Sequence, residues 1–88
     1  NVVEYRRASD ALADIEVKGI GDEVYFILRG GEGPMTVRLW NALGQEVANL
    51  SGEGVVVWSL PPQAASGVYF YQVVWGSEMR SGRVWVGR

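Results

Sequence analysis

The sequence predicts an all-β domain of seven antiparallel strands, and two observations carry this prediction. Short runs of β-branched and aromatic residues recur along the chain, several of them alternating apolar with polar side chains as half-buried strands do. Clusters of glycine, proline, asparagine and serine separate these runs at a spacing of roughly eight to twelve residues. Short strands spaced in this way form a sandwich or a barrel.

The first half of the chain supplies three strands. Residues 15–18 alternate apolar with charged side chains, and residues 19–22 follow as a turn with two glycines. Residues 24–28 are apolar on both faces, as expected of a central strand. After a glycine-rich loop at 29–34, residues 35–40 alternate again and form the third strand.

The middle of the chain supplies two shorter strands. A turn at 41–44 leads into a short strand at 45–48, and the glycine-containing stretch 51–54 introduces a fifth strand at 55–58. The segment 60–67 contains two adjacent prolines, which donate no hydrogen bond to a strand ladder. This segment therefore crosses from one sheet to the other or runs along an edge.

The last two strands are predicted to form a hairpin. Residues 68–75 are the strongest strand of the chain, expected to be central and buried on both faces. Gly76 and Ser77 fit a two-residue loop with glycine first, and residues 78–86 return as the last strand. We assign residues 14–88 to the sandwich and residues 1–13, which show no sustained period, to a lead-in or linker segment.

Composition excludes several classes of function. The chain of 88 residues has no cysteine and no histidine, which excludes disulfides, thiolate nucleophiles, Cys/His zinc sites and histidine proton relays. A net charge of −2 predicts no nucleic-acid partner, because such a partner requires a clustered basic face. The first residues lack both an initiator Met and the apolar core of a signal peptide, so we expect a piece of a longer precursor.

The acidic residues do not predict a catalytic or metal site. Most of them fall on turns and outward strand positions, whereas a carboxylate pair for hydrolysis has to face a cleft. Asp22, Glu23 and Glu32 could offer oxygen ligands to calcium, but a solvated turn is favoured without interleaved Asp and Asn positions. We predict that the chain is not an enzyme and uses no metal or cofactor.

Three aromatic residues fall on one face of the sixth predicted strand. Tyr69, Tyr71 and Trp75 lie two and four residues apart, and Trp40 and Trp85 could also reach a surface. The favoured interpretation is that Tyr69, Tyr71 and Trp75 fill the core. The alternatives are an aromatic surface for a partner protein or a platform on which sugar rings stack.

Three segments of the second half carry a family resemblance. Residues 37–47 read VRLWNALGQEV, Leu60 is followed by SGVYFY at 66–71, and residues 82–88 read GRVWVGR. In this order they resemble the "V-x-hydrophobic-aromatic-D/N-x-x-G-x-x-V", "L-x-x-G-V-Y" and basic-ended closing segments of the C-terminal sorting domains of the type IX secretion system. The three segments span residues 37–88.

The resemblance implies a seven-stranded antiparallel immunoglobulin-like β-sandwich at the end of an exported protein. In that family the domain is recognised in the periplasm, directs passage across the outer membrane and is often cleaved off. The implied partners are the outer-membrane secretion machinery and the rest of the chain's own precursor, with the cell surface or the extracellular space as the destination. The recognition residues that the resemblance implies are Gly44, Gly67, Tyr69, Arg83, Val84, Val86 and Arg88.

The chain departs from the family pattern in three places. The Asn-Pro that often opens the first strand is missing, the connection at 60–67 is longer than usual, and Trp85 is bulky for its position. The GVYFY segment at 67–71 is also similar to the immunoglobulin-like domain of flagellar hook-capping proteins. An accessory structural module of a secreted multidomain enzyme and a carbohydrate-binding module therefore stay open as alternatives. Unpaired strand edges would also allow a homodimer.

Overall fold

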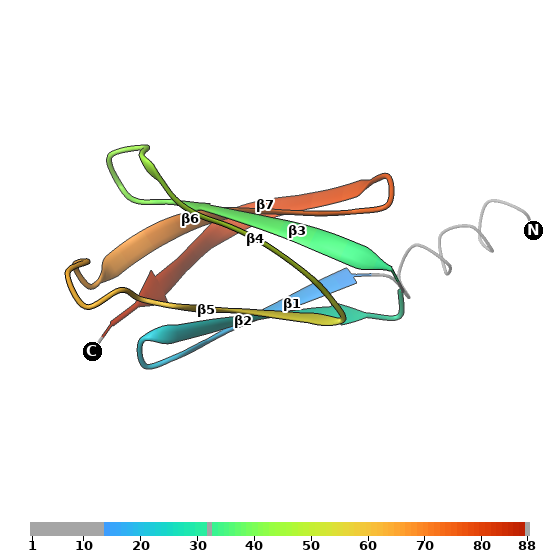
Figure 1. Ribbon diagram of the computed structural model, residues 1–88, viewed down its shortest axis with the longest axis horizontal. Helices are drawn as coiled ribbons and strands as arrows, with labels where there is room; N and C mark the ends of the chain where they lie inside the picture. Colours follow the sequence, from blue (N-terminus) through green and yellow to red (C-terminus); the bar gives the residue numbers. More distant parts are fainter. Residues whose placement is uncertain (1–13, 32, 88) are drawn as a thin grey trace, which may run out of the picture.

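The computed structural model describes residues 14–31 and 33–87, and within these residues all regular secondary structure is β-strand. Two antiparallel sheets pack face to face, as Figure 1 shows, which confirms the predicted seven-stranded sandwich. The predicted lead-in at 1–13, together with Glu32 and Arg88, lies outside the described residues. The strands are β1 (Asp14–Ile20), β2 (Glu23–Arg29), β3 (Pro34–Trp40), β4 (Glu46–Glu53), β5 (Val55–Ser59), β6 (Gly67–Trp75) and β7 (Glu78–Val86).

The order of the strands is that of an immunoglobulin-like sandwich. One sheet has the order β1-β2-β5 and the other the order β4-β3-β6-β7, so the fourth strand pairs with the third rather than joining the first sheet. The chain passes from β4 to β5 at Gly54, whose φ of 81° is easily adopted only by glycine. The proline-containing segment then carries the chain from β5 back to β6, as the sequence predicts.

The core lies between the sheets and follows the two-residue period of the strands. Each strand that contributes to it turns every second side chain inward, and β2 and β3 supply its centre. The buried apolar side chains are Val24, Phe26, Leu28, Met35, Val37, Leu39, Val56, Trp58, Leu60, Tyr69, Val73, Trp75 and Val86.

The prediction that residues 68–75 are buried on both faces is wrong. The strand β6 is central in its sheet, between β3 and β7, but only its inward face is covered. Val68, Phe70 and Val74 point to the outer face and are exposed. The reason is that the described part of the molecule has only two layers, so none of its elements covers the outer face of the four-stranded sheet.

Two strands are longer than the sequence predicts by three residues or more. The strand β1 continues through Gly19 and Ile20, and β4 continues to Glu53 instead of ending at residue 48. The ladder with β3 explains the extension of β4, because it pairs Thr36 with Ser51 and adds a contact between their hydroxyls. Leu50 is the one large apolar residue of this extension and packs half-buried against the core, while backbone pairing holds the polar residues around it.

A missing side chain on β7 makes room for an aromatic ring on β6. Gly82 is paired with Tyr71, and a Cβ at Gly82 would lie 2.6 Å from the Tyr71 Oη and 2.9 Å from its Cζ. The ring of Tyr71 packs edge-on against Phe26, with centroids 5.5 Å apart. The ring cannot retreat from a new Cβ without disturbing this contact.

We therefore expect Gly82→Ala to destabilise the fold by about 1–3 kcal/mol, as overpacking does. Gly67→Ala is the matched control, because Gly67 also lies on this strand pair but nothing lies within 4 Å of a Cβ there. Urea unfolding of both variants checks the prediction. Equal stabilities for the two variants would contradict the proposed fit between Gly82 and Tyr71.

Candidate functional site

Gly44 has a structural role in the turn between β3 and β4. Its φ is 85°, in the left-handed region, and its N–H donates to the carbonyl of Asn41 at 3.0 Å. The Asn41 side-chain oxygen accepts hydrogen bonds from the N–H groups of Leu43 and Gln45, each at 3.0 Å. This network supports the tight turn that the sequence predicts at residues 41–44.

Tyr69 anchors the crossing segment to the core. Its hydroxyl donates a hydrogen bond to the carbonyl oxygen of Ala65 at 2.6 Å, and its ring lies 5.2 Å from that of Trp58. A tyrosine at the start of this strand that binds the backbone a few residues upstream is the tyrosine corner of immunoglobulin-like sandwiches. Gly67, two residues earlier, has no positive φ and no neighbour within 4 Å of a Cβ.

The last strand divides its residues between core and solvent. Val86 is fully buried and Val84 half-buried, on the inward face of β7. Arg83 and Trp85 point to the outer face, where Trp85 is 65% exposed. The resemblance also singles out Arg88, which lies outside the described residues.

The free edge of β7 is partly covered at its C-terminal end by β1. The N–H of Gly87 donates to the carbonyl oxygen of Gly21 at 3.1 Å, and a Cβ at Gly19 would lie 3.1 Å from the carbonyl oxygen of Trp85. Arg80 also binds Asp14 at the other end of β1, at 3.1 Å. A partner strand can therefore reach the end of β7 only by displacing β1. The predicted homodimer through strand edges stays a prediction.

Tyr69, Tyr71 and Trp75 do not form an exposed aromatic surface, and that alternative is wrong. All three side chains face the core: Tyr69 and Trp75 are buried, and Tyr71 is half-buried against Phe26. The opposite face of the same strand is the exposed one. The period of two places these rings together correctly, and only the direction in which they face decides between core and surface.

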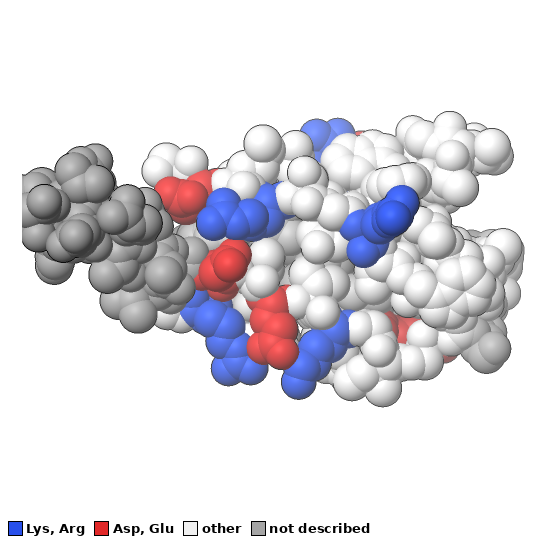
Figure 2. Space-filling model, turned by 180° about the vertical axis from the view of Figure 1, so that it is seen from behind, with Lys and Arg blue, Asp and Glu red and all other residues white. Residues whose placement is uncertain are grey.

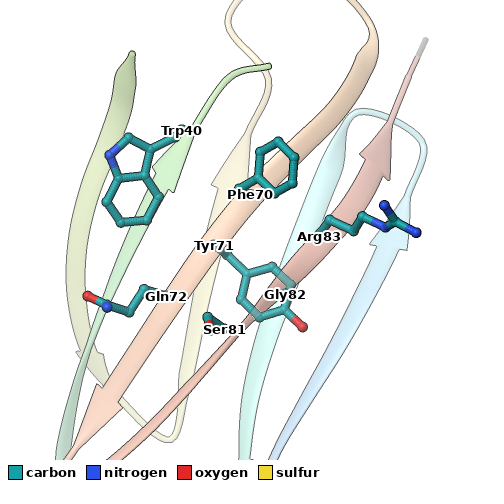
Figure 3. A pocket seen from close by; sticks show the side chains of 7 residues that line it. All are labelled: Trp40, Phe70, Tyr71, Gln72, Ser81, Gly82 and Arg83. Carbon is teal, nitrogen blue, oxygen red and sulfur yellow. The ribbon is translucent and has the colours of Figure 1, made fainter. Parts of the chain in front are cut away.

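An aromatic surface does exist on the outer face of the four-stranded sheet. It contains a shallow depression of about 490 Å³, which Figure 3 shows with Trp40 and Gln72 on one side, Arg83 on the other and Phe70 at one end. Phe70 is 43% exposed and Trp40 is half-buried. The lining residues are Trp40, Phe70, Tyr71, Gln72, Ser81, Gly82 and Arg83.

Strand register brings these side chains together. Phe70 is paired with Trp40 on β3 and with Arg83 on β7, so the three form one row across the sheet. Gln72 is paired with Arg38 and Ser81 in the next row on the same face. Phe70 was not among the predicted site residues, although its position between Tyr69 and Tyr71, on the opposite face of the strand, is the signal that could have identified it.

Arg38 holds Trp40 in place at the border of the depression. Its guanidinium carbon lies 5.0 Å from the centre of the indole ring, within the range of a cation–π interaction. The same guanidinium donates to Glu46 on β4, at 2.9 Å from Nη2 and 3.4 Å from Nε. The hydrogen bond from Arg38 keeps the pKa of Glu46 below its ordinary value of 4.5.

Charged side chains of both signs lie side by side toward one end of the face drawn in Figure 2, whereas the rest of that face is mostly uncharged. Glu16 forms an ion pair with Arg29 at 2.6 Å and with Lys18 at 3.5 Å. The hydrogen bond from Arg29 lowers the pKa of Glu16. One carboxylate oxygen of Glu23 accepts a hydrogen bond from the Tyr25 hydroxyl. This hydrogen bond raises the pKa of Tyr25.

The ion pairs of Glu16 and Glu46 predict a loss of stability in acid. Because both pKa values are lower in the folded state, their contribution is complete above the ordinary value of 4.5 and is lost as the pH falls through the folded pKa. We expect thermal melts between about pH 5 and pH 3 to show a smaller decline for Glu46→Gln than for the unaltered chain. Glu53→Gln removes a carboxylate that forms no ion pair within residues 14–31 and 33–87, and should keep the original profile. Identical profiles for all three proteins would contradict the prediction.

The acidic residues considered for calcium are not gathered into a site in the part of the chain that the structure describes. No group of three or more Asp and Glu side chains close enough to hold a metal ion occurs there, and Glu32 lies outside the described residues.

Within residues 14–31 and 33–87, no helix is long and apolar enough to cross a membrane.

Comparisons with known proteins add no assignment. No protein family, no curated protein and no solved structure matches this chain.

Proposed function

We propose that this chain is a C-terminal sorting domain that directs a larger protein across the outer membrane by type IX secretion. Its partner is the outer-membrane secretion machinery, met in the periplasm on the way to the cell surface or the extracellular space. The proposal starts from the ordered resemblance of residues 37–88. An accessory immunoglobulin-like module is the competing function, and the experiment below separates the two.

The single observation that carries the proposal is the outward face of the last strand. Among the described residues that the resemblance singles out, Arg83 alone has an exposed side chain, while Tyr69 and Val86 are buried and Val84 is half-buried. Trp85 lies two residues further along β7 on the same face and is largely exposed. Exposed tryptophan and arginine are the side chains that most often dominate binding energy at protein interfaces.

The other residues of the resemblance support the fold rather than the contact. Gly44 allows the turn, Tyr69 binds the crossing segment, and Val86 fills the core. A recognition surface built on Arg83 and Trp85 would use the outer face of the four-stranded sheet. This face stays open, whereas β1 covers the C-terminal end of the β7 edge.

The test is export of a reporter. Residues 1–88 are fused behind a folded, periplasm-targeted reporter in a bacterium that has this secretion system, and the reporter is measured in periplasm, on the surface and in the medium. We expect the fusion to reach the surface or the medium. The control, a reporter that lacks residues 1–88, should stay in the periplasm. Folded fusion that stays in the periplasm would contradict it and favour the accessory module.

A further inference from the structure

We propose that the depression on the outer face of the four-stranded sheet binds an acidic saccharide, with Arg83 holding its carboxylate. This inference goes beyond sorting, because it concerns a ligand that the folded chain binds alone. It rests on the shape, the lining chemistry and the charge of the depression.

The shape fits a small ligand rather than a deep active site. A volume of about 490 Å³ lies within the range of roughly 300–1,000 Å³ that ligand sites occupy. The row from Trp40 through Phe70 to Arg83 crosses three neighbouring strands, a span of about 10 Å at the usual strand spacing. A short oligosaccharide can lie along such a row and touch both aromatic rings.

The lining combines flat apolar rings with hydrogen-bonding groups. Phe70 and Trp40 offer ring surface to the C–H faces of a pyranose, and the Arg38 guanidinium together with Glu46 holds the indole in position before a ligand arrives. The Ser81 hydroxyl and the Gln72 amide oxygen lie in the neighbouring row and can bind sugar hydroxyls, while the Gln72 Nε2 donates to Met79 Sδ at 3.2 Å. A few polar groups among aromatic side chains are typical of small-molecule sites.

The charge of the depression selects an acidic sugar over a neutral one. Arg83 takes part in none of the ion pairs found within residues 14–31 and 33–87, and of the described residues that line the depression none carries a carboxylate. Nearby Arg38 is already neutralised by Glu46. The guanidinium of Arg83, which has no carboxylate partner among the described residues, can donate two parallel hydrogen bonds to the two oxygens of a uronate carboxylate. A nucleic acid would require several cations along a track, which a chain of net charge −2 does not offer here.

Isothermal titration of the purified chain with oligogalacturonate, against a neutral cello-oligosaccharide of equal length, tests the proposal. We expect binding of the acidic oligomer that weakens as salt is added, and binding of the neutral oligomer at least several-fold weaker. Arg83→Gln should weaken acidic binding roughly tenfold or more. Phe70→Ala should weaken the binding of both oligomers, because the site extends from Arg83 on β7 across the sheet face to β6.

Two controls separate the site from general effects. Lys18→Gln removes one positive charge on β1, and Val74→Ala shortens an exposed side chain on the same face outside the depression. Both should bind as the unaltered chain does. The proposal is overturned by absent binding, by equal binding of the neutral oligomer, or by an Arg83→Gln variant that binds normally. Because no secretion machinery is present, failure here leaves the sorting proposal untouched, and the converse also holds.

Discussion

Phe26→Ala is expected to destabilise the domain by about 3–5 kcal/mol, the cost of emptying the site of a fully buried phenylalanine. Phe26 is 0% exposed at the centre of the core and packs edge-on against Tyr71. A chain of 88 residues has a stability of roughly 4–13 kcal/mol in total. The variant should therefore have lost much of its folding free energy.

Phe70→Ala is the matched control, since it makes the same chemical change on the outer face. Phe70 is 43% exposed, and we expect a loss below about 1 kcal/mol. Chemical denaturation followed by far-ultraviolet circular dichroism measures both variants. Similar losses for the two would mean that the outer face is covered like the core, and would remove Phe70 from any ligand site.

Deletion of residues 84–88 is expected to unfold the domain or leave it marginally stable. Full burial of a valine contributes about 1.5–3 kcal/mol, and Val86 is 0% exposed. The deletion also removes half-buried Val84, the pairing of β7 with the start of β6, and the bond from Gly87 to Gly21. Together these losses amount to roughly 3–6 kcal/mol.

Trp85→Ser is the control for the deletion, because it changes the same segment without touching the core. Its side chain is largely exposed, so the melting temperature should stay close to that of the unaltered chain. A deletion variant as stable as Trp85→Ser would show that the last strand is not part of the cooperative fold. Otherwise a loss of export after deletion reports unfolding and says nothing about recognition.

The strands were predictable because their signals are local. Alternation of apolar and polar residues predicted β3, and the Gly76-Ser77 loop predicted the β6–β7 hairpin. The two prolines predicted the crossing between the sheets. The C-terminal half of β4 was not predictable, since Leu50 is its one large apolar residue and the polar residues around it are held by the ladder with β3. Strand length at a polar edge depends on the neighbour that supplies the hydrogen bonds.

The candidate site was only partly predictable for a related reason. The sequence placed Tyr69, Tyr71 and Trp75 on one face and left open where that face points, and the structure buries it. The row from Trp40 through Phe70 to Arg83 joins three strands, and its register follows from pairing between residues distant in sequence. The resemblance singled out Arg83, yet it could not separate exposed from buried members of the same motif.

Recognition through the outward face of β7 is tested most directly by export of the fused reporter carrying Arg83→Gln and Trp85→Ser together, compared with a Val74→Ala fusion. All three altered residues lie on the outer face of the same sheet, so each variant should remain folded. We expect the double variant to stay in the periplasm as folded protein while the Val74→Ala fusion is exported. Normal export of a folded double variant would contradict recognition through the outward face of β7.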